Sequence, residues 1–306
     1  MEILSSKTPK YDSARAMEVE KNLLMKQIMQ MPNLPTPSPI IMKLVQLLRY
    51  EEVQMKEIIN AIERDQSLVA QLMKLINSGF YGLKHKIDSV ETAVGLLGIT
   101  NLKQVIYSAT AVDLFSEEEK KEWEHAYSTS VLMTNIMKEN ELPVASNLPL
   151  TSLLHDMGKI VLRKFRPQKY KLAQMAADEK KVPLFQTEAA LINLNHAEVG
   201  AMIMERWQMT QDIITPVLYH HSKEIPNEFL LETALLKFAN WVDCLVRGIT
   251  CLEPERNLME ASGIEEIDKD YWISQQRSVV CTVRDGNFLE KPADTKKIPR
   301  QTPVRR

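Results

Sequence analysis

Residues 151–162 read T-S-L-L-H-D-M-G-K-I-V-L, and the rest of the chain is organised around this stretch. Its apolar residues have helical spacing, and it places His155 beside Asp156, with Gly158 and Lys159 following after Met157. Adjacent residues on a helix point about 100° apart, so both side chains can reach one metal ion only at the edge of the helix. Imidazole nitrogen and carboxylate oxygen together suit a divalent ion such as zinc, iron, manganese or nickel. Taken alone, one His-Asp pair is weak evidence for a site.

The order of the other histidines adds weight to this pair. Five of the six histidines, with two aspartates, form the series H…HD…H…HH…D. This order resembles the ligand series of the HD superfamily of metal-dependent phosphohydrolases, and especially its HD-GYP branch. The G-K after the pair also matches the HD-x-G-K sequence of that family. A single histidine on an amphipathic helix usually has only a structural role. Five in the family order, together with both carboxylates, argue against coincidence.

The resemblance implies two metal positions and a divalent cofactor: iron, manganese, zinc or nickel. The ligands of the first position would be His125, His155, Asp156 and Asp243. Those of the second would be His196, His220 and His221, with Asp156 as the bridge. Two ions about 3.5–4 Å apart would activate a water molecule and neutralise the charge of a phosphodiester. Lys159 would then stabilise the developing phosphoryl charge. The alternative for Lys159 is an ordinary surface lysine in the last turn of a helix.

One difference from the HD-GYP proteins concerns the expected substrate. HD-GYP proteins have an acidic residue and a G-Y-P segment after the doubled histidine, whereas residues 220–226 here read H-H-S-K-E-I-P. We therefore do not expect cyclic di-GMP as a substrate. The predicted metal ligands are unaffected, because none of them lies in the missing segment.

A second resemblance covers residues 34–246. The segments N-S-x-x-Y-G from Asn77 and A-x-x-x-L-G from Ala93 are its more specific parts, with an L-P-x-x-P-like segment at residues 34–39 and Asp65 in support. This pattern resembles the HDOD family, the bacterial signalling relatives of HD proteins. HDOD proteins generally have the fold of HD enzymes without the ligand series, and they act as regulatory or scaffolding modules. Three of the matching residues are expected to cap helices, namely Asn77, Ser78 and Gly98, and Asp65 is expected to cap or join helices.

Helical periodicity recurs along most of the chain and predicts an all-α protein, in which an N-terminal helical subdomain packs on an HD-type bundle. The expected parts are a leader helix in residues 1–30 that begins near Ser13, the N-terminal subdomain in 31–118, the bundle in 119–284 and a disordered basic tail in 285–306. Ser278–Val283 could instead form a short strand. Gly200 is expected to let two helices approach closely.

The overall composition and charge limit the classes of function that are expected. A formal charge of −2 over 306 residues gives no indication of nucleic-acid binding, and no stretch resembles a signal peptide or membrane span. The three cysteines are odd in number and lack C-x-x-C spacing, which is typical of reduced thiols in a cytoplasmic protein.

Two functions remain open at this stage. The favoured one is a cytoplasmic signal-transduction module that contacts a partner protein, with any metal acting structurally or as a sensor input. The alternative is a metal-dependent phosphohydrolase acting on a nucleotide or cyclic dinucleotide. An empty or single-metal site would favour the first function, and a paired-metal site open to solvent would favour the second.

Overall fold

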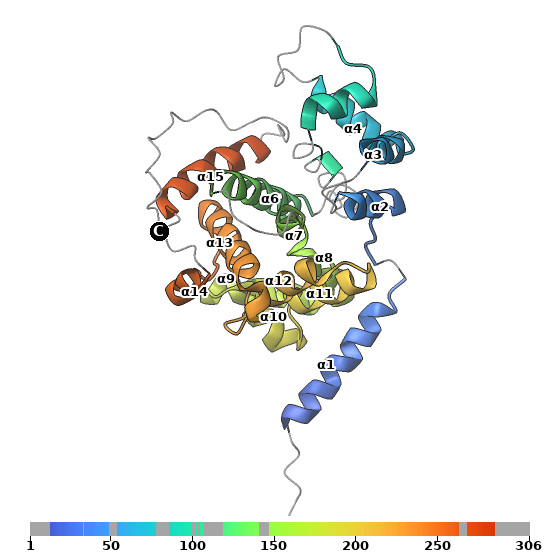
Figure 1. Cartoon of the computed structure of the whole chain (residues 1–306). Helices are drawn as coiled ribbons and strands as arrows, with labels where there is room; N and C mark the ends of the chain where they lie inside the picture. Colours follow the sequence, from blue (N-terminus) through green and yellow to red (C-terminus); the bar gives the residue numbers. More distant parts are fainter. Residues whose placement is uncertain are drawn as a thin grey trace, which may run out of the picture.

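The computed structural model of the chain describes residues 13–32, 34–48, 54–77, 86–98, 102, 105–106, 119–140, 147–262 and 268–284. Every regular element in these ranges is helical, so the prediction of an all-α fold is confirmed. Figure 1 shows a small group of helices, α2 to α4, beside a larger bundle that runs from α6 to α15. The expectations for the basic tail, and for Ser78, lie outside the described residues.

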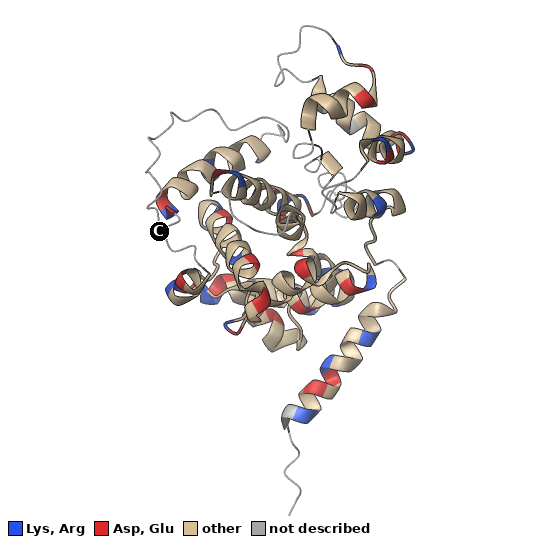
Figure 2. Ribbon diagram, in the orientation of Figure 1, with Lys and Arg blue, Asp and Glu red and all other residues tan. Residues whose placement is uncertain are grey.

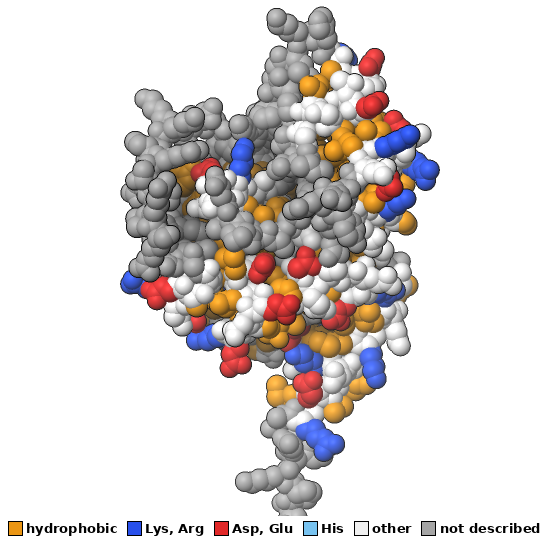
Figure 3. All heavy atoms as spheres, viewed as in Figure 1, with side chains coloured by type: hydrophobic (Ala, Val, Ile, Leu, Met, Phe, Trp, Pro, Cys, Tyr) orange, Lys and Arg blue, Asp and Glu red, His pale blue; other side chains and the backbone are white. Residues whose placement is uncertain are grey.

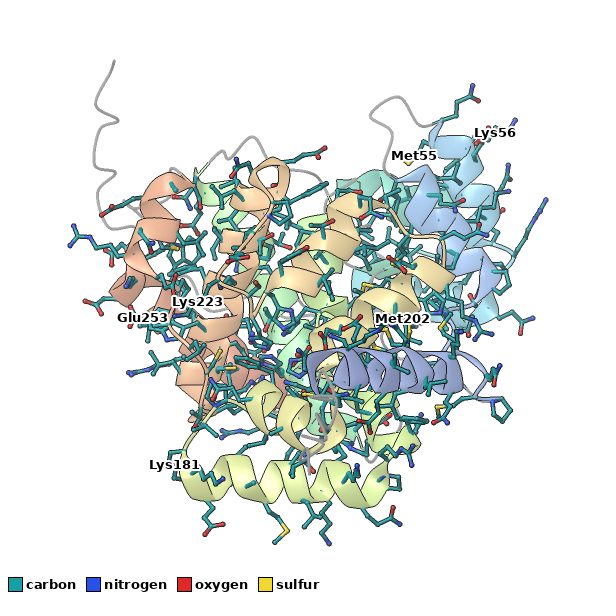
Figure 4. The ribbon with its side chains drawn as sticks, turned by 90° about the horizontal axis from the view of Figure 1, so that it is seen from below. Met55, Lys56, Lys181, Met202, Lys223 and Glu253 are labelled. Atoms are coloured by element: carbon teal, nitrogen blue, oxygen red, sulfur yellow. The ribbon has the colours of Figure 1, made fainter. Side chains whose placement is uncertain are left out.

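The leader helix α1 (Ser13–Met29) begins where the sequence predicted. One of its sides is buried, with Ile28 fully inaccessible. Lys21 forms an ion pair with Glu198, which belongs to α11 (His196–Arg206). Figure 4 shows α1 lying across the bundle near α11. The leader is therefore anchored to the same helix that begins with one of the predicted ligands.

The N-terminal group consists of α2 (Pro39–Leu47), α3 (Met55–Ile62), α4 (Gln66–Ile76) and a helix over residues 90–98. Each has an apolar face, and those faces meet in one core with the first half of the bundle. The shared core explains why this group packs on the bundle as the sequence predicted.

Two polar residues of the HDOD-like segments hold this group together. The Oδ1 atom of Asp65 accepts a hydrogen bond from the backbone N–H of Leu68 at 3.0 Å, which caps α4. Asn77 donates to the carbonyl oxygens of Met73 (3.0 Å) and Ile87 (2.8 Å) and accepts from the N–H of Ile87 (2.8 Å). Asn77 thus fastens the end of α4 to a segment ten residues further on, as a structural and not a catalytic residue.

The bundle begins with α6 and ends with α15. Its helices are α6 (Lys120–Asn140), α7 (Leu148–Leu154), α8 (Met157–Phe165), α9 (Pro167–Lys180), α10 (Leu184–Ile192), α11, α12 (Gln211–Tyr219), the short η3 (Asn227–Phe229), α13 (Leu230–Arg247), α14 (Arg256–Ala261) and α15 (Lys269–Arg284). Helix α11 packs between α8 and α12, while α6 packs against α7, α13 and α15. The predicted ligands come from the α6, α8, α11, α12 and α13 regions, so the site lies at the centre of the bundle.

Residues 278–283 are helical, and the alternative of a short strand there was wrong. Valine and threonine favour strands in the absence of tertiary contacts, and this preference was the reason for predicting a strand. The buried residues of α15 are Trp272, Gln276, Val279 and Val283, which recur at intervals of four, three and four. This spacing places them on one face of a helix, and that face packs on α6 and α13. Tertiary packing overrides the local preference.

Within the described ranges, no helix has the length and apolar character needed to cross a membrane. Figure 2 shows charged residues of both signs interspersed along α1 and over the bundle. This distribution agrees with the net charge of −2.

Candidate metal centre

The His-Asp pair lies at a break between two helices. Helix α7 ends at Leu154 and α8 begins at Met157, so His155 and Asp156 occupy the turn between them. Asp156 has φ −99° and ψ 6°, outside the helical region. This break redirects the carboxylate, which a continuous helix would have turned away from the neighbouring imidazole. Both residues are buried, with exposed fractions of 0% and 3%.

The close approach of helix α11 explains why position 158 is occupied by glycine. A Cβ atom at this position would lie 2.0 Å from the backbone oxygen of His196, closer than any non-bonded contact permits. A Cβ on Gly200 would lie 3.4 Å from the nearest atom, Cγ1 of Val217, so Gly200 contributes to a close approach of helices, as expected, but is the less strict of the two. The backbones of α8 and α11 therefore meet at Gly158, and this contact holds His196 near Asp156.

Asp156 is at the centre of four imidazoles. Its Oδ2 atom lies 3.3 Å from Nε2 of His125 and 3.4 Å from Nε2 of His155. Its Oδ1 atom lies 3.2 Å from Nε2 of His196 and 4.0 Å from Nε2 of His220. Each carboxylate oxygen therefore faces a different pair of histidines, as a bridging ligand would.

The second nitrogen of each ring, Nδ1, is held from behind by a hydrogen bond. The acceptors are Asp243 for His125 (2.6 Å), the carbonyl of Ser152 for His155 (2.7 Å), Glu188 for His196 (2.6 Å) and the carbonyl of Val217 for His220 (2.6 Å). A carbonyl oxygen can only accept, so Nδ1 carries the proton in His155 and His220 and leaves a lone pair on Nε2. Metal-binding histidines are typically oriented in this way.

Several polar atoms that face the centre have no partner. Among the described residues, these buried atoms include Nε2 of His125, His155 and His220, and Oδ1 of Asp156. Leaving such atoms unsatisfied costs about 1–3 kcal/mol each. The potential ligand atoms form two groups, one from His125, His155 and Asp156 and the other from His196, His220 and His221, each within 4.8 Å. Nitrogen-rich donor sets with one carboxylate fit divalent transition metals.

The electrostatic environment keeps most of these histidines neutral. Burial lowers the pKa of His155 to about 4, and it holds the pKa values of His220 and His221 well below their usual range. His125 differs, because burial acts to lower its pKa but the two flanking carboxylates, Asp156 and Asp243, outweigh burial and raise the pKa to about 9. Neutral imidazole is the form that binds a metal, so three of these ligands need not lose a proton first.

Asp243 lies behind His125, which differs from the expectation that it would converge with His155 and Asp156. Its Oδ2 accepts from Nδ1 of His125 (2.6 Å) and Nε of Arg247 (2.7 Å), and its Oδ1 accepts from Oγ of Ser128 (2.5 Å) and Nε2 of Gln276 (2.5 Å). Four donors around one carboxylate leave little capacity for a metal. In this arrangement Asp243 orients His125 and raises its basicity.

Glu188 is a site residue that the sequence reasoning missed. This residue of α10 is fully buried, and its Oε2 accepts from both the backbone N–H (2.9 Å) and Nδ1 (2.6 Å) of His196. It is the counterpart of Asp243 on the other side of the centre. No sequence signal identifies it, because it precedes His196 by eight positions in a separate helix and stands outside the histidine series.

Lys159 faces the carboxylate of Asp156, with Nζ 2.5 Å from Oδ2. It belongs to the first turn of α8, and its side chain is only 19% exposed, so it is not the surface lysine of a last turn. Burial acts to lower the pKa of Lys159, but the neighbouring carboxylate of Asp156 outweighs burial and raises this pKa. Burial acts to raise the pKa of Asp156. His155 and Lys159 outweigh this effect and hold the pKa of Asp156 well below its usual range. The proposed action on a phosphoryl group remains a prediction.

A cavity of about 230 Å³ reaches the centre on the His220–His221 side. His221 lies with Nε2 2.9 Å from Nε2 of His196, and its ring stacks on Phe185 at 4.3 Å. Figure 4 shows Lys223 and Glu253, which both line the cavity, together at one edge of the bundle. On the face drawn in Figure 3, no described histidine reaches the surface, in agreement with their burial.

Comparison with known proteins places these features in context. The HDOD domain model matches residues 34–223. An uncharacterised protein of Treponema pallidum (strain Nichols) is 26% identical over 233 residues, which are 74% of this chain and 45% of that protein. The chain spans less than half the length of the curated relatives that it matches.

Three crystal structures have a similar fold. An HDOD domain protein of unknown function from Geobacter sulfurreducens superposes with a TM-score of 0.73 at 24% identity, covering 88% of this chain and 97% of that one. A candidate signal transduction protein from Marinobacter aquaeolei VT8 has a TM-score of 0.67 at 18% identity, covering 90% and 65%. A candidate phosphohydrolase from Shewanella amazonensis SB2B has a TM-score of 0.66 at 15% identity, covering 87% and 97%. At these identities the likeness concerns the fold alone.

Proposed function

Because the chain belongs to the HDOD family, we propose that it is a signal-transduction module that acts through a partner protein and binds a divalent metal at its His-Asp cluster. The metal would be iron, manganese, zinc or nickel, since these ions accept mixed imidazole and carboxylate ligands. The metal centre would link the helices of the bundle, and the partner would bind elsewhere on the surface.

The convergence of the histidines on Asp156 is the observation that carries this proposal. Within the described part of the chain, three Nε2 atoms and one carboxylate oxygen are buried without a hydrogen-bond partner, although each of these three rings is held at Nδ1. Such an arrangement is costly as a purely structural core, because each desolvated acceptor or donor lacks compensation. A divalent ion in each of the two donor groups, which would also supply Lewis acidity and positive charge, would satisfy these atoms.

A signalling role agrees with the burial of the centre. Asp156 is only 3% exposed, and Lys159 already pairs with it, so neither group is freely presented to a substrate. The ligands come from helices far apart in sequence, and a ligand that binds only the folded arrangement stabilises it. Metal occupancy would therefore change the stability of the whole bundle, which a partner could sense. The Marinobacter neighbour, named as a candidate signal transduction protein, agrees with this role.

The second candidate function is a phosphohydrolase acting on a nucleotide or cyclic dinucleotide. It is favoured by the two donor groups on either side of Asp156 and by the cavity that reaches His220 and His221. Lys223 and Lys237 line this cavity and could contact an anionic group, but Glu253 and Glu255 line it as well, so its charges balance. In this reading Asp156 would orient both donor groups, and Lys159 would stabilise charge on the phosphoryl oxygens. The name of the Shewanella neighbour agrees with this alternative.

Metal analysis of purified protein tests the shared premise of both functions. The protein is purified without chelator and without nickel affinity resin, and its metal content is measured by mass spectrometry. We expect the wild type to retain a divalent transition metal and Asp156→Ala to lose it, because both donor groups include or face this carboxylate. His85→Ala is the matched control, since His85 stands outside the predicted ligand series. Wild-type metal content in Asp156→Ala would refute the proposed centre.

A paired assay separates the two functions. The metal-loaded protein is offered nucleotides, cyclic dinucleotides and a generic phosphodiester under reducing conditions. Metal-dependent turnover that disappears in both Asp156→Ala and His220→Ala would establish the phosphohydrolase and reject the signalling proposal. No turnover, together with a partner that binds the loaded wild type but not Asp156→Ala, would support the signalling module.

A further inference from the structure

The cavity beside the centre has an exposed rim and a buried inner wall. Its volume of about 230 Å³ is far more than one water molecule needs. Lys223 and Glu253, at the edge of the bundle in Figure 4, belong to the rim, where both are exposed. The inner wall is formed by Lys237 and Asn240 of α13, of which Asn240 is only 4% exposed. A small molecule that passes the rim therefore meets these two side chains.

The amide of Asn240 turns its donors toward the cavity. Its Oδ1 accepts a hydrogen bond from Sγ of Cys244 at 3.3 Å, one turn further along α13. This bond identifies the oxygen end of the amide, so Nδ2 points away from Cys244. Within the described part of the chain, Nδ2 makes no hydrogen bond, although Asn240 is almost fully buried and lines the cavity. Two N–H groups of a buried amide thus remain for a ligand.

Lys237 adds a positive charge to the inner wall. It stands three residues before Asn240, and residues with this spacing are neighbours on a helix, with Cβ atoms about 5–6 Å apart. Its Nζ donates to the carbonyl oxygen of Ser222 at 2.6 Å, which holds the ammonium group beside the segment that carries His221. An ammonium group has three N–H bonds, so two remain after this contact. Burial lowers the pKa of Lys237, because its charge is only partly solvated.

The other charged residues of the lining already have partners. A carboxylate oxygen of Glu255 lies 3.6 Å from Nζ of Lys223, and Glu253 forms an ion pair with Lys269, which is not part of the lining. Lys237 has no carboxylate within 4 Å among the described residues. Two lysines and two glutamates line the cavity in balance, yet Lys237 is the one among them without an ion-pair partner of its own in the described ranges.

We propose that Lys237 and Asn240 form a binding site for the oxyanion group, carboxylate or phosphoryl, of a small ligand that enters this cavity. The free polar groups of the inner wall are all donors, and one of them is charged. Their complement is a group that carries negative charge and only accepts hydrogen bonds. Phe185 and Leu252 also line the cavity and would contact the apolar part of such a ligand. This inference goes beyond the proposed function, since the anion needs neither a metal nor hydrolysis in order to bind.

NMR of the side-chain amide tests the site directly. The full chain is labelled with [15N]asparagine, and the Nδ2 signal of Asn240 is identified by its loss in Asn240→Asp, or in Asn240→Ser if the aspartate variant does not fold. Inorganic phosphate and acetate are titrated separately, with sodium chloride keeping the ionic strength constant. We expect a saturable shift of this signal, and the anion that binds more tightly identifies the group. No saturable shift with either anion would overturn the proposal.

A lysine variant and a matched control test the role of the charge. Lys237→Met keeps most of the apolar stem and should weaken binding about 10- to 100-fold, the usual effect of losing charge-assisted hydrogen bonds. Lys171→Met changes the net charge equally at an exposed position of α9, outside the cavity lining, and should leave the affinity unchanged. Equal losses in the two variants would show a general charge effect and reject the site.

Metal removal separates this site from the candidate metal centre. The titration is carried out on the protein as purified and repeated after treatment with a chelator and dialysis. We expect the same affinity at the Asn240 signal in both samples, whatever metal content is measured. Binding that disappears with the metal would assign the anion to the metal centre and overturn the proposal.

Discussion

Gly158 is the residue on which the geometry of the centre most directly depends. We predict that Gly158→Ala destabilises the protein by about 3 kcal/mol or more, because the new methyl group would meet the rigid backbone oxygen of His196. The displaced His196 should also weaken metal binding. Chemical denaturation and metal titration measure the two effects.

Gly95→Ala is the control for this substitution. Gly95 lies in the helix over residues 90–98, and a Cβ there would meet no atom of the described residues within 4 Å. Alanine at such a position should stabilise the protein by up to about 1 kcal/mol. Equal effects of the two substitutions would contradict the close contact between α8 and α11.

Glu188 tests the importance of the groups behind the ligands. Glu188→Gln keeps the size of the side chain but removes the charge that acts on Nδ1 of His196. We predict that metal affinity falls about 10- to 100-fold, since outer partners of a ligating histidine have effects of this size. Competition with a chromogenic chelator gives the affinity. Glu179→Gln, at an exposed position on α9, should leave it unchanged. An unchanged affinity in Glu188→Gln would mean that His196 is not a ligand.

At the scale of helices, the start of α11 controls one half of the centre. Asn195 caps this helix by accepting from the N–H of Glu198 at 3.1 Å, and Glu198 accepts in return from the N–H of Asn195 at 3.0 Å. Because His196 is the first residue of α11, fraying of this turn would displace its ring. We predict that Asn195→Ala lowers stability by about 0.5–2 kcal/mol and weakens metal binding.

The start of α12 provides a comparison. Thr210 precedes this helix, but its side chain makes no capping bond, and its buried hydroxyl has no hydrogen-bond partner among the residues that the structure describes. Thr210→Val should therefore be neutral or slightly stabilising in thermal unfolding. A larger loss in Thr210→Val than in Asn195→Ala would show that the cap is not what holds α11 in place.

At the scale of the whole molecule, the histidines should set the pH dependence of stability in the metal-free protein. The unfolded chain takes up protons near pH 6.5, whereas burial keeps His155 neutral until its pKa of about 4. The unfolded state therefore binds more protons below pH 6.5, and stability falls as the pH falls. His155 alone should account for a loss of about 2 kcal/mol by pH 5.

His125 predicts a loss on the alkaline side as well. Its pKa of about 9 means that only the folded state is protonated between pH 6.5 and 9, so its stabilisation is lost as the pH rises through this range. Denaturant unfolding in the presence of a chelator should thus show a maximum near pH 6.5. His125→Gln should flatten the alkaline side only. Stability that rises steadily from pH 5 to 9 in the wild type would contradict the assignment of His125, and stability that stays constant between pH 6.5 and 5 would contradict that of His155.

The helical fold could be predicted from the sequence because hydrophobic periodicity is a local property. The start of α1 at Ser13 and the caps at Asp65 and Asn77 follow from residues that are neighbours along the chain. The order of the histidines also allowed His155 and Asp156 to be selected, through resemblance to a family. Where local preference and packing disagreed, as in residues 278–283, the prediction failed.

Only the tertiary structure decided how the site is built. His125 and Asp243 are 118 positions apart, and nothing local determines which ring nitrogen faces the carboxylate. The role of Glu188 depends likewise on the packing of α10 against the start of α11. Side-chain orientation in a buried centre is set by the contacts between helices. The sequence of one helix does not determine which helices pack against it.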